Sequence, residues 1–352
     1  MGLWRNRADA TRSPTNGAKR APRGRCDARE APVSFAGVDI SCAFATSMDT
    51  PEHVALAEQL GYRRAWLYDS PALYPEVFMT LARCAERTRR IGLGPGVLIP
   101  SLRHPMTAAA SIAGLEALAP GRVMIGVGSG FTGRHCLGKR PLAWATVSRY
   151  VRTLQALLRG EQTEWEDAAI QMLQPEGFGA ARPVDVKWVV GVQGPKGQAV
   201  AHEIGDGAFS LFPIEGFDWM VQLAFGTVLD DGEDAGSERA IAAAGPAVAV
   251  LLHGSYEQGA PLDPAWAAEI EKIDERTRHL AVHDRHLIAV TERDRPYITG
   301  DLIRAFTYTG TASEIADKVE ASAAAGVTEI AFQPAGPDIP RELRAFAAAA
   351  GA

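Results

Sequence analysis

The chain has 352 residues, 47% of them hydrophobic, and a formal net charge of −6. This length suits one large domain or two ordinary ones with a substantial core, and the acidic balance argues against a nucleic-acid partner. No apolar run approaches the ~20 residues of a transmembrane helix, so we expect no membrane association.

Residues 1–31 differ in composition from the rest of the chain. They contain eight Lys or Arg and three Asp or Glu, so they carry a net charge of +5 and the remaining residues carry −11. The segment has few apolar residues and no periodicity, so burial cannot offset the entropy lost on ordering. We therefore predict a disordered basic extension over 1–31 and one folded domain over 32–352.

From residue 38 onward, short apolar runs alternate with longer amphipathic segments. This alternation indicates βα units and a parallel sheet that is buried on both faces. The expected strands lie at 38–44, 63–69, 90–98, 123–128, 187–192, 207–212, 247–253 and 329–334. The expected helices lie at 51–60, 75–88, 105–118, 141–159, 195–204, 216–229, 263–284 and 311–325.

A repeated junction favours closure of this sheet into a (β/α)8 TIM barrel over an open, doubly wound sheet. A glycine separates a helical segment from the next strand at Gly61, Gly121, Gly205 and Gly326. Two stretches, 160–186 and 285–310, exceed ordinary loop length. We expect both to be insertions at the carboxyl-terminal face, where the active sites of such barrels lie.

The first candidate site follows the fourth expected strand. Gly128-Ser129-Gly130 begins a G-x-G-x-x-G pattern that ends at Gly133. A dinucleotide-binding unit would also need an acid about 20 residues later, at the next strand end, where the helical segment 149–152 stands instead. Three interpretations remain open: dinucleotide binding, close approach of the backbone to a ligand phosphate or ring, and a tight loop without a ligand.

The second candidate site, Gln193-Gly194-Pro195-Lys196, follows the fifth expected strand. Gly194 permits an unusual backbone angle, and Pro195 suits the first turn of a helix. Backbone N–H groups there, together with Lys196, could receive an anion. A plain strand-to-helix turn is the alternative.

Two further features mark strand ends. Glycine and proline around Gly96 and Val97 predict a bulge or bend in the third strand, which could face a ligand or be purely structural. Asp69 ends the second strand, where a carboxylate would point into the mouth of a barrel. Its alternative role is the N-cap of a helix that starts near Pro71.

The histidines and cysteines carry weaker signals. His279, His283 and His286 could share one helical face at spacings that bind zinc. We favour a solvated, charged helix face over a metal site or a substrate contact, so we expect no metal. The four cysteines show no CxxC or framework spacing, which indicates free thiols in a reducing cytoplasm.

Four segments, taken in order, resemble the luciferase-like superfamily. They are WLYD, LGPGVLIPSLRHP, GRVMIGVGSG and GVQGPKGQAVAHEIGDGAF. They are most similar to the F420-dependent branch that includes methylenetetrahydromethanopterin reductases, and the similarity spans residues 36–335. The resemblance implies a bacterial-luciferase-like barrel with deazaflavin F420 as cofactor, or FMN as the alternative.

The resemblance also implies roles for individual residues. The Gly96–Val97 peptide bond would be cis, although neither residue is proline, and would form a bulge behind the deazaflavin ring. Asp69 would lie near the pyrimidine side of the ring. The loop at Gly128–Gly130 would contact the cofactor tail, and the loop at Gln193–Lys196 would hold the ring and the phosphate. The implied cofactor-binding residues are Asp69, Gly96, Val97, Gly128, Ser129, Gly130, Gln193, Gly194, Pro195 and Lys196.

Two positions depart from the sugar-phosphate dehydrogenases of this branch, because Ser70 and Phe131 stand where those enzymes have His and Glu. The resemblance then implies hydride transfer between F420 and some other small organic substrate, with Asp69, His104 and His283 as catalytic candidates. An FMN-dependent monooxygenase and a non-catalytic flavin-binding barrel are the alternatives. A homodimer is implied by the resemblance alone.

Overall fold

The computed structural model describes residues 34–351 of the chain. Residues 32–352 form one compact unit. The disorder expected for residues 1–31 concerns a part of the chain outside the described range and stays a prediction. Among residues 34–351, none of the helices has the length and apolar character that a bilayer-spanning segment requires.

Eight parallel strands form a barrel. Bridges between Leu93 and Val123 and between Leu98 and Val127 join the β4 and β5 segments and complete the ring, so the predicted (β/α)8 barrel is confirmed. Round the barrel, the strands are β4 (Gly92–Pro95), β3 (Arg64–Leu67), β2 (Val38–Phe44), β11 (Glu329–Gln333), β10 (Met220–Phe225), β9 (Gly207–Ser210), β8 (Lys187–Gly191) and β5 (Met124–Gly128). A two-residue strand, β1 (Ser34–Phe35), pairs antiparallel with β2.

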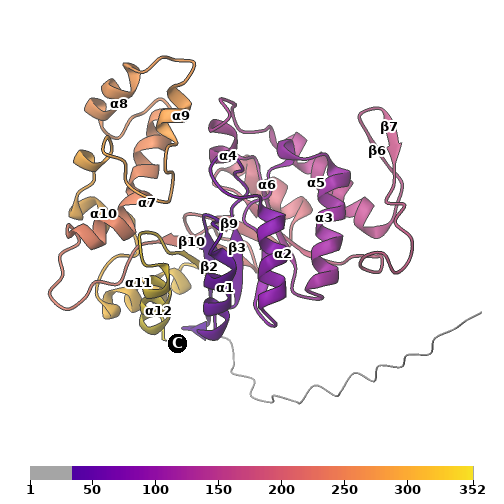
Figure 1. Ribbon diagram of the computed structural model, residues 1–352, viewed down its shortest axis with the longest axis horizontal. Helices are drawn as coiled ribbons and strands as arrows, with labels where there is room; N and C mark the ends of the chain where they lie inside the picture. Colours follow the sequence, from indigo (N-terminus) through magenta and orange to yellow (C-terminus); the bar gives the residue numbers. More distant parts are fainter. Residues whose placement is uncertain (1–33, 352) are drawn as a thin grey trace, which may run out of the picture. The chain divides into compact units, whose positions relative to one another are not determined.

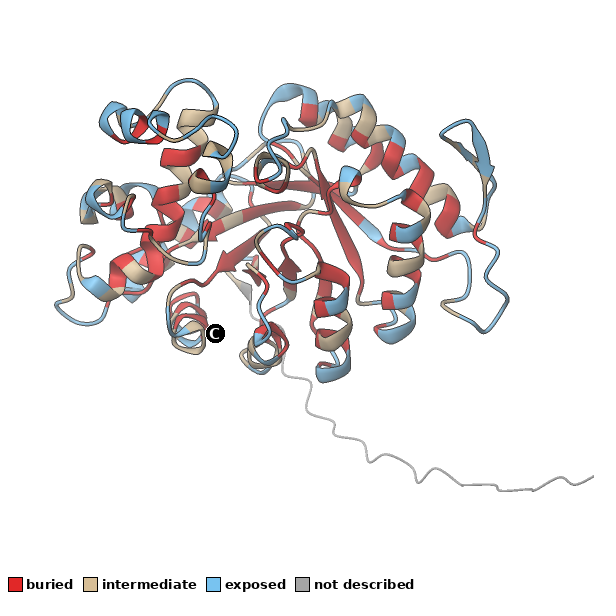
Figure 2. Cartoon of the chain, turned by 45° about the horizontal axis from the view of Figure 1, so that its top comes forward, coloured by how far each residue is buried: buried red, intermediate tan, exposed pale blue. Residues whose placement is uncertain are grey.

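Helices cover the outside of the barrel and bury one face against it, as Figure 2 shows. Those that pack round the strands are α1 (Thr50–Gln59), α2 (Val77–Arg87), α3 (Pro105–Leu118), α5 (Trp144–Arg159), α6 (Pro195–Ile204), α11 (Ala312–Ala324) and α12 (Ile339–Ala349). The others are α4 (Phe131–His135), α7 (Glu238–Glu257), α8 (Pro264–Glu271), α9 (Arg278–Val282) and α10 (Gly300–Phe306), with 3-10 turns at Pro100–Leu102 and Arg295–Tyr297.

Side chains alternate between two cores along each strand. On β11, Ile330 and Phe332 pack in the core between strands and helices, whereas Ala331 packs inside the barrel. The interior layer consists of Ala43, Trp66, Met124, Val189, Phe209, Val221 and Ala331, with Tyr68 and Tyr74 towards one end. The barrel is therefore filled by side chains, as is usual for this architecture.

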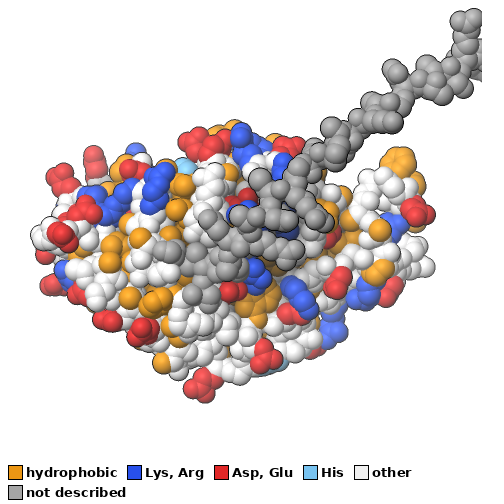
Figure 3. All heavy atoms as spheres, turned by 90° about the horizontal axis from the view of Figure 1, so that it is seen from below, with side chains coloured by type: hydrophobic (Ala, Val, Ile, Leu, Met, Phe, Trp, Pro, Cys, Tyr) orange, Lys and Arg blue, Asp and Glu red, His pale blue; other side chains and the backbone are white. Residues whose placement is uncertain are grey.

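A buried carboxylate organises the amino-terminal end of the barrel. Glu329, at the start of β11, is fully buried. It accepts hydrogen bonds from the indole N–H groups of Trp66 (2.9 Å) and Trp219 (2.8 Å) and pairs with Arg64 at 2.7 Å. On the face seen from below in Figure 3, acidic and basic side chains are interspersed with hydrophobic ones. Because packed and paired groups fill this end, an active site belongs at the opposite end.

Two elements predicted near the seventh strand are wrong. Residues 247–253, predicted as a strand, lie within α7, and residues 216–229, predicted as a helix, contain β10. A short apolar run such as AVAVLLH does not by itself distinguish a buried helix from a buried strand. The residues before this run establish α7. The Ser237 side chain caps the helix by accepting from the Ala240 N–H, and an alanine-rich turn follows.

The two long insertions take different places. Residues 160–186 hold a hairpin of β6 (Thr163–Trp165) and β7 (Ala168–Ile170), which lies on the outer wall beside α5 (Figure 1). Their predicted position over the carboxyl-terminal face is therefore wrong, because the hairpin joins α5 to β8. Residues 285–310 belong to the long path from β10 to β11, which also carries α7 to α10.

Candidate active site

The Gly96–Val97 peptide bond, just beyond β4, is cis, as the resemblance implied. The chain after it remains tied to β5. The Leu98 N–H donates to the Gly126 carbonyl at 2.7 Å, and the Gly128 N–H donates to the Leu98 carbonyl at 3.1 Å. These two hydrogen bonds hold the bulge against the carboxyl end of β5.

Two glycines make room for the Val97 side chain, and a third makes room for the Pro95 carbonyl. A Cβ atom added at Gly128 would lie 2.8 Å from Val97 Cγ2, and one at Gly191 would lie 2.9 Å from Val97 Cγ1. A Cβ atom at Gly126 would lie 2.7 Å from the Pro95 carbonyl oxygen. These separations are shorter than van der Waals contact, so β5 and β8 need glycine where they face the bulge.

The other glycines of the G-x-G-x-x-G pattern pack against Ile99. A Cβ atom would lie 2.6 Å from Ile99 Cγ2 at Gly130 and 2.4 Å from Ile99 Cδ1 at Gly133. Gly130 also has a φ of +82°, a conformation that favours glycine. Because β5 belongs to a barrel, the dinucleotide-binding interpretation is wrong. Packing against Ile99 requires these glycines, and the close approach of a ligand to the same loop stays a prediction.

Asp69 lies at the end of the β3 segment and is 2% exposed. Its Oδ2 atom accepts from the Ile99 N–H at 3.1 Å, and its two oxygens accept from the Arg103 guanidinium at 2.6 and 2.9 Å. Arg103 also donates to Glu76 at 2.6 Å. The alternative role of Asp69 as a helix N-cap is wrong, because Glu76 caps α2 by accepting from the Met79 N–H.

The charge of Arg103 determines what Asp69 can do. Burial alone would lower the pKa of Arg103, but hydrogen bonds and negative charge from Asp69 and Glu76 outweigh burial and raise that pKa. Asp69 therefore faces a permanent positive charge in a bidentate pair. A carboxylate engaged in this way holds the Ile99 backbone and the Arg103 side chain in place.

The fifth-turn segment, Gln193–Lys196, is exposed at the start of α6. Pro195 is the first residue of α6, as predicted, but Gly194 has an ordinary extended backbone with a φ of −103°, so the predicted unusual angle is wrong. No atom lies within 4 Å of the place where a Gly194 Cβ would stand. Pro195 has no N–H group, and the Gly197 and Gln198 N–H groups donate to the Gly194 carbonyl at 3.0 and 3.1 Å. The backbone N–H and the side chain of Lys196 are therefore the donors that the first turn of α6 offers to an anion.

The fourth and fifth turns lie side by side at the same end of the barrel. β5 and β8 pair in parallel, with Gly128 opposite Gly191. Ser129–Gly130 and Gln193–Lys196 follow directly after these paired residues. The tertiary structure thus brings together two loops that the sequence separates by about sixty residues.

Tyr68 and Gln333 meet at the mouth of the barrel. The Tyr68 O–H donates to Gln333 Oε1 at 3.1 Å, and Gln333 Nε2 donates to the Leu287 carbonyl at 3.2 Å. The stretch 285–310 therefore begins over the strand ends, as predicted for it. Burial raises the pKa of Tyr68 well above its usual range, so this hydroxyl remains a proton donor. Sequence reasoning missed Tyr68 and Gln333, because their contact joins two strands and no local motif marks it.

The two histidines proposed as catalytic have other local partners. His104 is exposed and caps α3, where its Nδ1 accepts from the Met106 N–H at 3.1 Å. His283 is buried, and its Nε2 lies 2.7 Å from Glu257 Oε1 on α7. His286 is buried as well, so the predicted solvated helix face is wrong. No contact tests their catalytic role, which stays a prediction.

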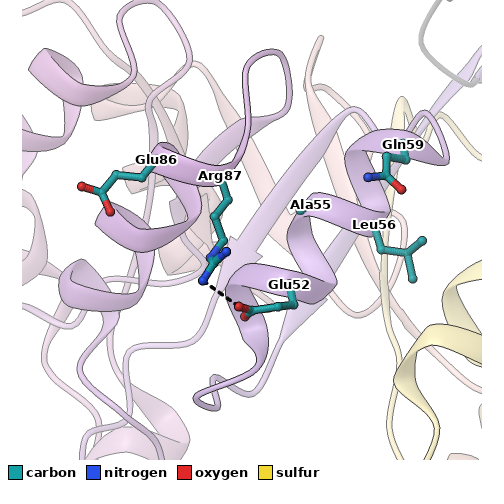
Figure 4. Close-up of a pocket in the computed structure, with 6 residues that line it drawn as sticks. All are labelled: Glu52, Ala55, Leu56, Gln59, Glu86 and Arg87. Carbon is teal, nitrogen blue, oxygen red and sulfur yellow. Dashed lines mark ion pairs between the residues drawn. The ribbon is translucent and has the colours of Figure 1, made fainter.

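Two hollows on the outer wall involve none of these residues. One, of about 510 Å³, lies between α1 and α2, where Arg87 and Glu52 form an ion pair at 2.8 Å (Figure 4). The other, of about 660 Å³, is lined by α5, β6 and α6. Neither is lined by residues at the carboxyl ends of the barrel strands, so the candidate active site is assigned from the strand-end geometry.

Comparison with known proteins identifies the family. The family described as luciferase-like monooxygenase matches residues 35–329. A 5,10-methylenetetrahydromethanopterin reductase of Methanolobus tindarius is 31% identical over 163 residues, which cover 44% of this chain but only 47% of that protein. The corresponding protein of Archaeoglobus fulgidus is 26% identical over 318 residues, which cover 83% of this chain and 91% of the relative.

Solved structures share the fold. The coenzyme F420-dependent tetrahydromethanopterin reductase of Methanopyrus kandleri aligns with a TM-score of 0.64 at 20% identity, over 88% of this chain and 97% of that one. The oxygenating constituent of 3,6-diketocamphane monooxygenase from Pseudomonas putida, solved with FMN, aligns with a TM-score of 0.57 at 12% identity, over 89% and 97%. Structural similarity at such identities establishes the barrel and leaves the cofactor open.

Proposed function

Since the chain belongs to the luciferase-like monooxygenase family and is an oxidoreductase, we propose that it transfers a hydride between deazaflavin F420 and a small organic substrate. The observation that carries the proposal is that the loops after β5 and β8 adjoin each other next to the cis Gly96–Val97 step. F420 is favoured over FMN because the relative from Archaeoglobus, which aligns over most of its length, is a methylenetetrahydromethanopterin reductase, and the matching Methanopyrus enzyme is F420-dependent.

The residues present fit a planar, phosphate-bearing group. The open space at Gly194 and the backbone N–H and side chain of Lys196 would hold the phosphate, and the backbone of Ser129–Gly130 would contact the tail. The Val97 segment would support one face of the ring. When bound, F420 would supply the carbon that accepts or donates the hydride.

The chain's own residues would position the substrate at the mouth. The Tyr68 hydroxyl and the Gln333 amide, which already bond to each other, offer a donor and an acceptor beside the strand ends. We further infer a cytoplasmic location, because Cys42, Cys84 and Cys136 are free and buried, which suits a reducing compartment. The homodimer stays a prediction.

A side-by-side titration of the purified full-length protein with F420 and FMN tests the cofactor. We expect F420 fluorescence to be quenched on binding at concentrations where FMN binds weakly. Tighter binding of FMN would favour the monooxygenase alternative, and binding of neither cofactor would refute both.

Two lysines at opposite ends of the β8 segment provide a matched pair of variants. Lys196 follows the carboxyl end of this strand, whereas Lys187 begins it at the opposite end of the barrel and pairs with Asp206. Lys196→Ala should weaken F420 binding about 2- to 5-fold, which corresponds to about 0.5–1 kcal/mol for an exposed charge. Lys187→Ala should leave the affinity unchanged. Equal effects of the two substitutions would contradict the placement of the phosphate at α6.

A further inference from the structure

A cluster of five titratable side chains lies next to the barrel mouth, outside the proposed cofactor site. His253 and Glu257 come from α7, His283 and His286 follow α9, and His135 ends α4. The three histidines His253, His283 and His286 are between 1% and 4% exposed. Buried histidines in such numbers need partners, because an unpaired polar group in the interior is destabilising.

The three buried rings lie close to one another. One ligand nitrogen from each of His253, His283 and His286 lies within 4.8 Å of the corresponding atoms of the other two. Their ring centroids are 5.3, 5.9 and 6.2 Å apart. Around a tetrahedral ion with metal–nitrogen bonds of about 2.0–2.1 Å, three such centroids would be about 5 Å apart. A small inward movement would therefore bring all three rings onto one ion.

Each ring has a partner on its Nε2 side. The Nε2 contacts are His253 with Asp294 Oδ2 at 3.3 Å, His283 with Glu257 Oε1 at 2.7 Å, and His286 with Thr132 Oγ1 at 3.3 Å. Carboxylate oxygens accept hydrogen bonds. The Nε2 atoms of His253 and His283 therefore donate to Asp294 and Glu257.

The Nδ1 atoms of the three rings have no partner among the described residues. Within residues 34–351, the Nδ1 atoms of His253, His283 and His286 are buried and have no hydrogen-bond partner. For His253 and His283, donation from Nε2 leaves a lone pair on Nδ1. When His286 likewise donates from Nε2, to Thr132 Oγ1, all three Nδ1 atoms carry a lone pair that one cation can accept.

We propose that His253, His283 and His286 bind a divalent transition-metal ion of the Zn²⁺ type through their Nδ1 atoms. Three imidazoles with an open fourth position, filled by water, are an established zinc ligand set. Carboxylates that accept from the distal nitrogen of metal-bound histidines orient the rings and raise their basicity, which is the arrangement of Asp294 and Glu257 here. This site replaces the expectation of no metal and does not depend on the proposed hydride transfer.

The ion would hold the insertion over the barrel mouth. The carbonyl oxygen of His286 accepts from the Tyr74 O–H at 2.6 Å, and that of the next residue, Leu287, accepts from Gln333. A metal bound to His286 would therefore join α7 and the segment after α9 to residues at the mouth. We expect metal removal to loosen this insertion and to weaken substrate binding.

Metal binding can be measured on the untagged full-length protein after removal of metals with a chelator. Calorimetric titration with Zn²⁺ should give one tight site per chain, and X-ray absorption should show three imidazole nitrogens at about 2.0–2.1 Å. Co²⁺ in the same protein should give the visible bands of a four-coordinate site. Less than one bound Zn²⁺ per chain, or a ligand shell without imidazole, would overturn the proposal.

Substitutions locate the site. His286→Gln should lower zinc affinity at least 100-fold, whereas His279→Gln, on α9 and outside the cluster, should not change it. Equal losses in these two variants would refute the assignment. Asp294→Asn, which keeps the side-chain shape, should lower zinc affinity about 10- to 100-fold, against no change for the exposed Asp301→Asn. Circular dichroism identifies any variant that fails to fold. If a variant does not fold, the Zn²⁺ and Co²⁺ measurements on the unsubstituted protein decide whether the three histidines bind a metal ion.

Discussion

Replacing Asp69 by Asn removes a negative charge from the centre of the proposed site and keeps the side-chain shape. The Asp69 and Arg103 side chains are 1% and 9% exposed, so the pair is largely shielded from water. Removing one partner of a buried ion pair costs about 3–5 kcal/mol, because the other charge is left behind. Arg103 retains Glu76 as a second partner, so we expect about 3 kcal/mol, at the lower end of that range.

Urea denaturation of Asp69→Asn and Glu76→Gln measures this difference. Glu76 is 37% exposed at its side chain, and its substitution should cost no more than about 1 kcal/mol. An Asn side chain can still accept from the Ile99 N–H, so the bulge remains anchored and the charge alone is tested. A loss of stability in Asp69→Asn no larger than that in Glu76→Gln would refute the conclusion that Arg103 depends on Asp69.

Two other predictions concern packing and pH. Gly128→Ala places a methyl group 2.8 Å from Val97 Cγ2, so overpacking should destabilise the protein by about 1–3 kcal/mol and weaken F420 binding. As a control, Gly114→Ala adds a methyl group in open space on α3 and should stabilise the protein by about 0.5–1 kcal/mol. A hydrogen bond from Arg239 lowers the pKa of Glu233 from 4.5 to about 2, so this carboxylate stabilises the fold above pH 4.5 and loses that effect as the pH falls towards 2. The stability difference between the unsubstituted protein and Glu233→Gln in urea should therefore shrink between pH 7 and pH 3, and a constant difference would contradict this assignment.

Local patterns were sufficient for most of the barrel. The helix α6 was predicted with its bounds at residues 195–204, because a proline marks its start and a helix–glycine–strand junction marks its end. The seventh strand was misplaced, since MVQLAF and AVAVLLH are both short apolar runs and only their neighbours in the folded protein separate them. Strand β10 is selected by pairing with β9 and β11.

The candidate sites were also predicted only in part. The resemblance located the loops after the fourth and fifth strands and the cis step between them. It did not show that Gly128 faces Val97, or that Arg103 neutralises Asp69. The sequence singled out His283 and His286 but missed His253, because His253 lies thirty residues before His283, on a segment predicted as a strand.

The sequence by itself determined most of the succession of strands and helices, the family likeness and the positions of the strand-end loops, because these follow from hydrophobic period and from motifs within one segment. Only the tertiary structure decided which side chains share a buried space, which glycines are required by a neighbour, and which histidine nitrogens lack partners. These properties depend on contacts between residues far apart in the chain. Such contacts form when the barrel closes, and no local pattern encodes them.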